Sequence, residues 1–182
     1  MFRDRAEAGR QLAPLVADLA LDVLVVRKLG YPPQPELALG AIGEGGVRVL
    51  NAGLVGRLGV ADRVIDELAA REQVELDRRL ALYRSGNQGV DVAGRAVVVV
   101  DGLATGATAR AALDVVRAGG ADRVVLAVPV APPGVVRALR AETAEVVCVE
   151  VSERFVGIGQ WYDDFHQVVD DEVQRLLQGS LS

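Results

Sequence analysis

The second half of the chain alternates between short apolar runs rich in β-branched residues and segments whose apolar positions recur every three or four residues. The runs predict strands and the spaced segments predict helices, in the order strand 96–100, helix ending near Ala118, strand 124–130, helix 133–141, strand 146–151 and helix 171–178. Strands that alternate with helices of this length are typical of an α/β fold, with a parallel sheet and helices on both of its faces.

The first half has a less regular pattern. An apolar stripe predicts a helix over 4–19, which Pro14 kinks or splits because proline lacks an amide hydrogen and its ring clashes inside a helix. The run LDVLVV, residues 21–26, has the composition of a strand that is buried on both faces in a parallel sheet. The proline-rich stretch GYPPQP, residues 30–35, predicts a loop.

Two further segments extend this core. The stretch 38–50 predicts a hairpin that turns at its glycine pair, and a long helix of mixed charge follows over 60–83. We interpret residues 1–182 as a single domain, in which 38–94 form a hairpin and lid-helix insertion and 152–182 form a C-terminal flap. The long helix is interpreted as a solvated lid or as an oligomer contact.

The composition argues against several classes of function. The net charge is −5 and no basic stripe stands out, so we expect no nucleic-acid partner. The single cysteine, Cys148, and the single histidine, His166, exclude a disulfide framework and a metal centre of several thiolates or histidines. The charged start MFRDRAEAGRQ does not resemble a signal peptide, and no apolar run approaches the roughly 18 residues that span a membrane. We therefore expect a cytoplasmic protein without a membrane partner.

Candidate chemistry concentrates in the turn DGLATGAT, residues 101–108, between the strand 96–100 and the following helix. Ligands of open α/β sheets bind beyond the carboxyl ends of the strands. The first amides of a helix have no internal partner and carry the positive end of the helix dipole. The glycines let the backbone approach a ligand closely, and Thr105 and Thr108 add hydroxyl groups. The turn, here called the phosphate cradle, is therefore a candidate phosphate site.

Asp101 changes the expected ligand. No lysine follows the last glycine, so the turn is not a Walker A loop, and its spacing is not that of a dinucleotide fingerprint. A carboxylate at the end of the strand would repel phosphate, but it would accept hydrogen bonds from sugar hydroxyls. The inferred ligand is a ribose 5-phosphate. The alternative is that Asp101 and the threonines only cap the helix.

The stretch VVVVDGLATGAT resembles the signature with which type I phosphoribosyltransferases bind phosphoribosyl pyrophosphate (PRPP). In that family an apolar strand ends in two acids, and Thr-Gly-x-Thr follows. Other stretches are similar, in order, to a bacterial branch of this family with an uncertain substrate: FRDRAEAGRQLA, LDVLVVRKLGYPPQPELALGAIGEGG, VVLAVPVAPP and FVGIGQWYDDFHQVVDDEVQRLL. The resemblance covers nearly the whole chain and implies the type I phosphoribosyltransferase fold.

The resemblance also implies a function in nucleotide metabolism. The protein would be a glycosyltransferase that moves the 5-phosphoribosyl group of PRPP to an unknown nitrogenous acceptor and releases pyrophosphate. Asp101 would be the catalytic residue that holds the ribose hydroxyls, with Mg²⁺ bound to the substrate rather than by protein ligands. Because the transition state resembles an oxocarbenium ion, the protein would act through positioning and charge stabilisation.

Nine further residues are candidate substrate contacts: Gly102, Leu103, Ala104, Thr105, Gly106, Ala107, Thr108, Arg27 and Lys28. The resemblance implies that the backbone and hydroxyls of 104–108 bind the 5-phosphate. Arg27 and Lys28 follow a strand, so they would reach the same rim of the sheet and neutralise pyrophosphate. The alternative for this pair is a solvated position at the end of the strand.

Two departures from the family support a second hypothesis. Val100 takes the place of the first acid of the signature, and LAPLVADLA runs straight into LDVLVV. The family has a strand, a Pro-Arg-Gly-Gly pyrophosphate loop and a helix between these two segments. The missing strand would lie beside the signature strand, so the remaining strands or another chain must cover the open edge, and we expect a homodimer. The second hypothesis is a catalytically impaired regulatory protein that binds PRPP or a nucleotide monophosphate.

Three other features receive structural interpretations. The aromatic residues of ERFVGIGQWYDDFHQ pack the flap against the core in the interpretation we favour, and they stack on a substrate base in the alternative. The acidic run 170–172 is the start of a helix rather than a metal site. His166 is a packed or surface residue rather than a general base.

Overall fold

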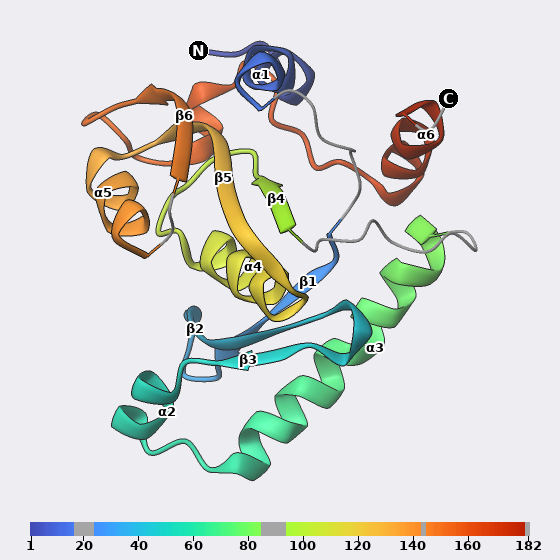
Figure 1. The fold of residues 1–182 in the computed structure, drawn as a ribbon, viewed down its shortest axis with the longest axis vertical. Coiled ribbons are helices and arrows are strands. Elements are labelled where there is room, and N and C mark those ends of the chain that lie inside the picture. The colour runs from blue at the N-terminus through green and yellow to red at the C-terminus, as the bar shows by residue number, and fades with distance from the viewer. Residues whose placement is uncertain (17–23, 85–93, 143–144, 181–182) are drawn as a thin grey trace.

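The computed structural model describes residues 1–16, 24–84, 94–142 and 145–180, which contain two three-stranded sheets (Figure 1). The parallel sheet has the order β4-β5-β6, with β4 at Gly94–Val99, β5 at Ala121–Ala131 and β6 at Glu145–Val151. The antiparallel sheet has the order β1-β2-β3, with bounds Val26–Tyr31, Gln34–Gly43 and Arg48–Leu50.

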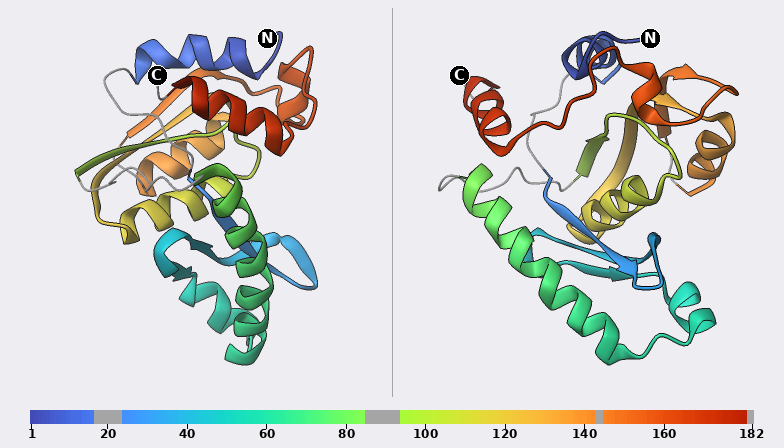
Figure 2. Two further views of the ribbon diagram at one scale, coloured as in Figure 1. Left: turned by 90° about the vertical axis from the view of Figure 1, so that its right-hand side faces the viewer. Right: turned by 180° about the vertical axis from the view of Figure 1, so that it is seen from behind.

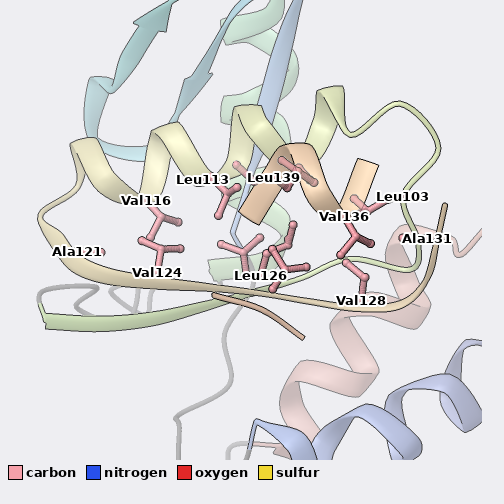
Figure 3. Close-up of a cluster of buried hydrophobic side chains, with 14 residues drawn as sticks. Leu103, Leu113, Val116, Ala121, Val124, Leu126, Val128, Ala131, Val136 and Leu139 are labelled. Atoms are coloured by element: carbon pink, nitrogen blue, oxygen red, sulfur yellow. The ribbon is translucent and has the colours of Figure 1, made fainter. Parts of the chain in front are cut away.

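The parallel sheet is covered on both faces, as the sequence predicts. Helices α4 (Ala107–Ala118) and α5 (Pro133–Glu142) pack on one face, and α1 (Arg5–Leu12) lies on the other (Figure 3). The central strand β5 is buried on both faces, which explains its nearly continuous apolar sequence. The α/β fold class is confirmed.

Helix α4 lies between the two sheets. Leu113 and Val116 belong to the apolar cluster that faces the parallel sheet. Ala111 and Val115 pack instead against Ala41 of β2. Helix α4 is therefore packed on two sides. The phosphate cradle leads directly into its first turn.

The prediction for the run LDVLVV was wrong. Residues 21–23 lie outside the described residues, and the strand that follows them, β1, pairs antiparallel with β2 in the register Val26 to Gly43. The proline-rich loop is also shorter than predicted, because β1 continues to Tyr31 and β2 begins at Gln34. Irregular pairing around Gly30 accommodates residues that cannot donate a backbone hydrogen bond.

The predicted hairpin is confirmed: β2 and β3 are joined by a short turn in which Gly45 and Gly46 both have positive φ. Helix α3 (Asp62–Arg84) packs along the antiparallel sheet and also contacts α6 (Asp170–Ser180), which lies with α1 towards the other end of the molecule (Figure 2). The α-helical part of the first predicted helix ends at Leu12, and Pro14 lies in the 3₁₀ turn Ala13–Leu15 that follows it, whereas residues 17–19 of that prediction lie outside the described residues.

The short helix α2 (Ala52–Leu58) was not predicted. Its signals are local: the side chain of Asn51 accepts a hydrogen bond from the amide of Leu54, and Gly59 ends the helix in the left-handed conformation.

Strand β4 forms an edge of the parallel sheet among the described residues, because it pairs only with β5 there. The side chain of Val99, the last residue of β4, is half exposed. The sequence analysis predicts that the strand beside the signature strand is missing. The position of β4 at the edge agrees with this prediction, because β1 pairs with β2 and not with β4.

Candidate functional site

The phosphate cradle connects β4 to α4. The amide of Leu103 donates a 3.0 Å hydrogen bond to the carbonyl of Val130 in β5, and the Leu103 side chain is only 2% exposed. Leu103 therefore anchors the turn to the sheet instead of facing a ligand. Gly106 adopts φ 77° just before the helix, and a Cβ there would lie 3.1 Å from Nη1 of Arg110 and 3.2 Å from Cγ1 of Val135. Only glycine fits this position without strain.

The first turn of α4 is accessible from outside. Ala104, Thr105 and Thr108 are exposed, and Gly106 has no side chain that could cap the helix. The Thr105 hydroxyl accepts a 3.3 Å hydrogen bond from the amide of Ala107, so the capping interpretation holds for this one residue. Beside them lies a pocket of about 440 Å³, whose lining includes Thr105, Ala107, Arg110, Asp114 and Asn51. The start of the helix can therefore be reached by a solute.

Asp101 contacts both the N-terminal helix α1 and the flap. Its Oδ2 accepts a 3.0 Å hydrogen bond from Nε of Arg5, the first residue of α1. Its backbone carbonyl accepts a 2.6 Å hydrogen bond from the hydroxyl of Tyr162. Sequence reasoning missed Arg5, because no spacing pattern connects two residues that lie 96 positions apart.

The aromatic residues of the flap pack against the core. Tyr162 is buried between the rings of Phe2 and Phe165, at centroid distances of 5.5 and 4.8 Å. Burial raises the pKa of Tyr162 to about 12, and the nearby charge of Asp101 acts in the same direction. The backbones of Phe2 and Trp161 are hydrogen-bonded at 2.7 Å, which joins the N-terminal segment to the flap. This confirms the packing interpretation.

Comparison with known proteins shows to which family the chain belongs. Two curated relatives, "Putative phosphoribosyl transferase Rv0571c" of Mycobacterium tuberculosis strain H37Rv and "Putative phosphoribosyl transferase MT0597" of strain CDC 1551, are each 44% identical over 97% of the chain. The chain belongs to a phosphoribosyltransferase-like family. It spans about half of these relatives, 46% of their length. No family model matches it.

A solved structure extends this assignment to the fold. The crystal structure of TT1426 from Thermus thermophilus is similar to this family member with a TM-score of 0.82 and 38% identity, over 98% of each chain. The alignment with the mycobacterial relatives runs over 205 positions, although the chain has only 182 residues. The relatives therefore contain residues that this family member lacks. The predicted absence of a strand, a loop and a helix requires such a difference in length.

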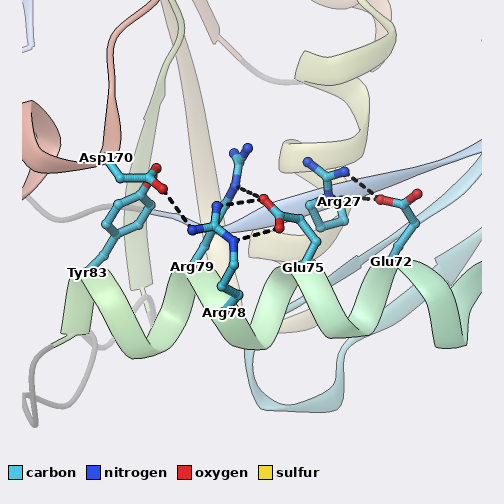
Figure 4. A network of polar contacts seen from close by, with 7 residues as sticks. All are labelled: Arg27, Glu72, Glu75, Arg78, Arg79, Tyr83 and Asp170. Carbon is cyan, nitrogen blue, oxygen red and sulfur yellow. Dashed lines mark hydrogen bonds and ion pairs between the residues drawn. The ribbon is translucent and has the colours of Figure 1, made fainter.

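Arg27 and Lys28 are not placed at the carboxyl end of the parallel sheet. Arg27 donates 2.6 and 2.9 Å hydrogen bonds to Glu72 of α3 (Figure 4). Nζ of Lys28 lies 3.9 Å from a carboxylate oxygen of Glu36. The prediction of a shared rim was wrong because their strand, β1, is part of the antiparallel sheet. The arrangement gives no support for a role at pyrophosphate.

The predicted lid helix α3 is bonded to α6 in this phosphoribosyltransferase-like chain. Asp170, at the start of α6, accepts a 2.8 Å hydrogen bond from Arg78 and a 2.6 Å hydrogen bond from the Tyr83 hydroxyl (Figure 4). Arg78 and Arg79 also bind Glu75, which lowers the pKa of that carboxyl to about 2. The acidic run 170–172 starts a helix, as predicted.

The described residues hold no group of three or more histidine, cysteine, aspartate or glutamate side chains that could bind a metal ion. None of the helices in those same residues is long and apolar enough to cross a membrane.

His166 is an exposed residue of the flap, and we expect it to titrate above its usual range. Its Nδ1 lies 2.9 Å from Oδ1 of Asp164, and its Nε2 lies 3.6 Å from Oε2 of Glu172. The hydrogen bond with Asp164 is the main cause of a pKa raised above 6.5, and Glu172 adds to it. The stabilisation of the folded protein is therefore full below pH 6.5 and is lost as the pH rises through the raised pKa.

NMR titration of the imidazole measures this directly. In Asp164→Asn the pKa of His166 should fall towards 6.5, and the variant Glu172→Gln should lower it less because the distance is longer. An unchanged pKa in Asp164→Asn would show that this pair does not form in solution.

Proposed function

We propose that this chain is a phosphoribosyltransferase domain, which binds PRPP at the phosphate cradle and transfers its 5-phosphoribosyl group to a nitrogenous acceptor. The observation that carries the proposal is the junction of an accessible helix start with Asp101 at the carboxyl end of β4. Relatives named as phosphoribosyl transferases, at 44% identity, support the same class of reaction.

Each part of the cradle has a separate task in this proposal. The amides at the start of α4 and the exposed hydroxyl of Thr108 bind the 5-phosphate, where the helix dipole favours negative charge. Asp101 accepts hydrogen bonds from the ribose hydroxyls and orients the sugar. A carboxylate at this place also stabilises the positive charge that develops on the ring as pyrophosphate leaves.

The residues of the cradle fit Mg²⁺ only as an ion that arrives with the substrate. Mg²⁺ is commonly held by one or two carboxylates together with substrate phosphates and water. Asp101 is the one carboxylate of the turn, and its side chain is 41% exposed. When bound, Mg²⁺ would neutralise the pyrophosphate leaving group, and Asp101 would be its contact on the protein.

A second candidate function follows from the position of Val100. Its side chain packs against the apolar cluster of the parallel sheet, so an apolar group takes the place of the first acid of the signature. A sugar would then be held by a single carboxylate. The candidate is a regulatory protein that binds PRPP or a nucleotide monophosphate without turning it over.

Calorimetric titration distinguishes the two functions. PRPP with Mg²⁺, ribose 5-phosphate and AMP are titrated into the wild type, into Asp101→Asn and into Asp122→Asn. Asp122 is an exposed residue at the start of β5, so its variant controls for the change of charge. We expect PRPP to bind more tightly than ribose 5-phosphate. We also expect Asp101→Asn alone to weaken both by about tenfold, since a hydrogen bond to a charged group contributes about 1.5 kcal/mol.

Each outcome has a clear meaning. Equal affinities for PRPP and ribose 5-phosphate would favour the regulatory protein, because the pyrophosphate group would then make no contact. Absence of binding by all three ligands would overturn both functions.

A further inference from the structure

The guanidinium group of Arg5 joins three groups of the site. It donates hydrogen bonds to Oδ2 of Asp101 at 3.0 Å and to the carbonyl of His166 at 2.6 Å. Its central carbon lies 3.8 Å from the centroid of the Phe165 ring, which is the geometry of a cation–π contact. One side chain of α1 therefore contacts both the cradle and the flap.

The backbone around Arg5 is held as well. The Asp4 side chain caps α1 by accepting a 2.7 Å hydrogen bond from the amide of Glu7. The carbonyl of Arg3 accepts a 2.8 Å hydrogen bond from the amide of Asp164, and that of Phe2 accepts one of 2.9 Å from the amide of Asp163. Arg5 is thus presented from a fixed helix end, so its contact with Asp101 does not depend on a mobile main chain.

The contact leaves half of the Asp101 carboxylate available. Arg5 binds Oδ2, whereas Oδ1 makes no hydrogen bond with any described residue. The side chain of Asp101 is partly exposed, so part of it faces solvent. Because the guanidinium is held by the carbonyl of His166 and the ring of Phe165, its Nε–H meets Oδ2 from a defined direction, whereas the ammonium group of a lysine is less constrained.

We propose that Arg5 is a positioning residue for sugar recognition, which orients Asp101 so that its second oxygen meets the ribose hydroxyls. This inference rests on the proposed function. The affinity for the sugar should then depend on the flap as well, because Phe165 and the carbonyl of His166 contact the same guanidinium group. The 5-phosphate subsite is independent of Arg5, because the amides of α4 form it.

The test compares ribose 5-phosphate with inorganic phosphate, which has no hydroxyls for Asp101. Affinities for both are measured by calorimetry for the wild type, Arg5→Ala, Arg5→Lys and Phe165→Leu. We expect Arg5→Ala to weaken ribose 5-phosphate by about tenfold and to leave inorganic phosphate within about twofold. Arg5→Lys should restore part of the loss, and Phe165→Leu should weaken ribose 5-phosphate by about threefold although it does not contact Asp101.

Arg3→Ala is the matched control. Arg3 is a neighbouring arginine whose side chain is paired with Glu7 at 3.2 Å and is largely exposed. Its removal should change neither affinity. Thermal unfolding of every variant shows whether the fold is retained, and Arg5→Lys and Phe165→Leu keep the test valid where Arg5→Ala does not fold.

The results separate three explanations. Equal losses for both ligands in Arg5→Ala would overturn the proposal, because Arg5 would then support the fold of the whole site. Tighter binding of ribose 5-phosphate by Arg5→Ala would also overturn it, because Arg5 would then block Asp101. If the wild type binds neither ligand, the proposed function fails and this inference fails with it.

Discussion

Replacement of Gly106 by valine should strongly weaken phosphate binding at the cradle while leaving most of the fold intact. Gly106 adopts φ 77°, and its Cβ would lie 3.1 Å from Nη1 of Arg110 and 3.2 Å from Cγ1 of Val135. A β-branched residue is disfavoured in this conformation by about 1–3 kcal/mol, and relief of the strain rotates the peptide that starts α4. The amides would then no longer converge on one point. We expect the affinity for ribose 5-phosphate to fall by a factor on the order of 100.

Gly45→Val is the control for the backbone strain alone. Gly45 adopts φ 69° in the hairpin turn, and its Cβ would meet no atom within 4 Å. This variant should lose a similar amount of stability in urea unfolding and should bind ribose 5-phosphate like the wild type. If Gly106→Val binds the ligand as tightly as Gly45→Val does, the phosphate does not lie at the start of α4.

The parallel half of the fold could be predicted because its signals are local. Each apolar run forms one strand of that sheet, and each spaced segment forms one helix within a few residues of the expected bounds. The position of the turn 101–108 between a strand and a helix could be predicted for the same reason, since its glycines, its threonines and Asp101 are continuous in the sequence. Strands, helices and turns of this kind depend mainly on residues that are close in the sequence, so the pattern of apolar and polar residues indicates them directly.

The partner of β1 could not be predicted in this way. The run LDVLVV overlaps β1 only at its last residue, Val26, so the composition of the run does not indicate which strand β1 pairs with. In this chain β1 pairs with β2, and β4 keeps one edge free of described strands. Arg27 and Lys28 are residues of β1 and therefore lie in the antiparallel sheet, which is why their expected role at the rim has no support.

The contacts of Arg5 and Tyr162 with Asp101 were missed for a related reason. These two residues meet Asp101 only because the N-terminal segment and the flap lie side by side across the end of the parallel sheet. The isolated bridge between Phe2 and Tyr162 joins these two segments, and no periodicity in either of them indicates it. Contacts between distant parts of a chain depend on tertiary packing, so they can be identified only from the structure.

Leu103→Ala should destabilise the protein and weaken the cradle together. Leu103 is a cradle residue, but its side chain is almost fully buried in the apolar cluster between the parallel sheet, α4 and α5. Truncation of a buried leucine leaves a cavity and costs about 2–5 kcal/mol of unfolding free energy. Alanine keeps the backbone amide that donates a 3.0 Å hydrogen bond to Val130, but it loses the buried side chain that packs the turn against the sheet, so the turn should also become less ordered. We expect ribose 5-phosphate to bind about tenfold more weakly.

Leu126→Ala separates the two effects. Leu126 is a leucine of the same apolar cluster, but it belongs to the middle of β5 and has no backbone contact with the turn. Urea unfolding should show a comparable loss of stability for both variants, whereas calorimetry should show weaker binding of ribose 5-phosphate only for Leu103→Ala. Equal losses of affinity would mean that binding follows the stability of the whole sheet. A selective loss would mean that Leu103 holds the phosphate amides in place, and that a residue facing away from the ligand sets the geometry of the cradle.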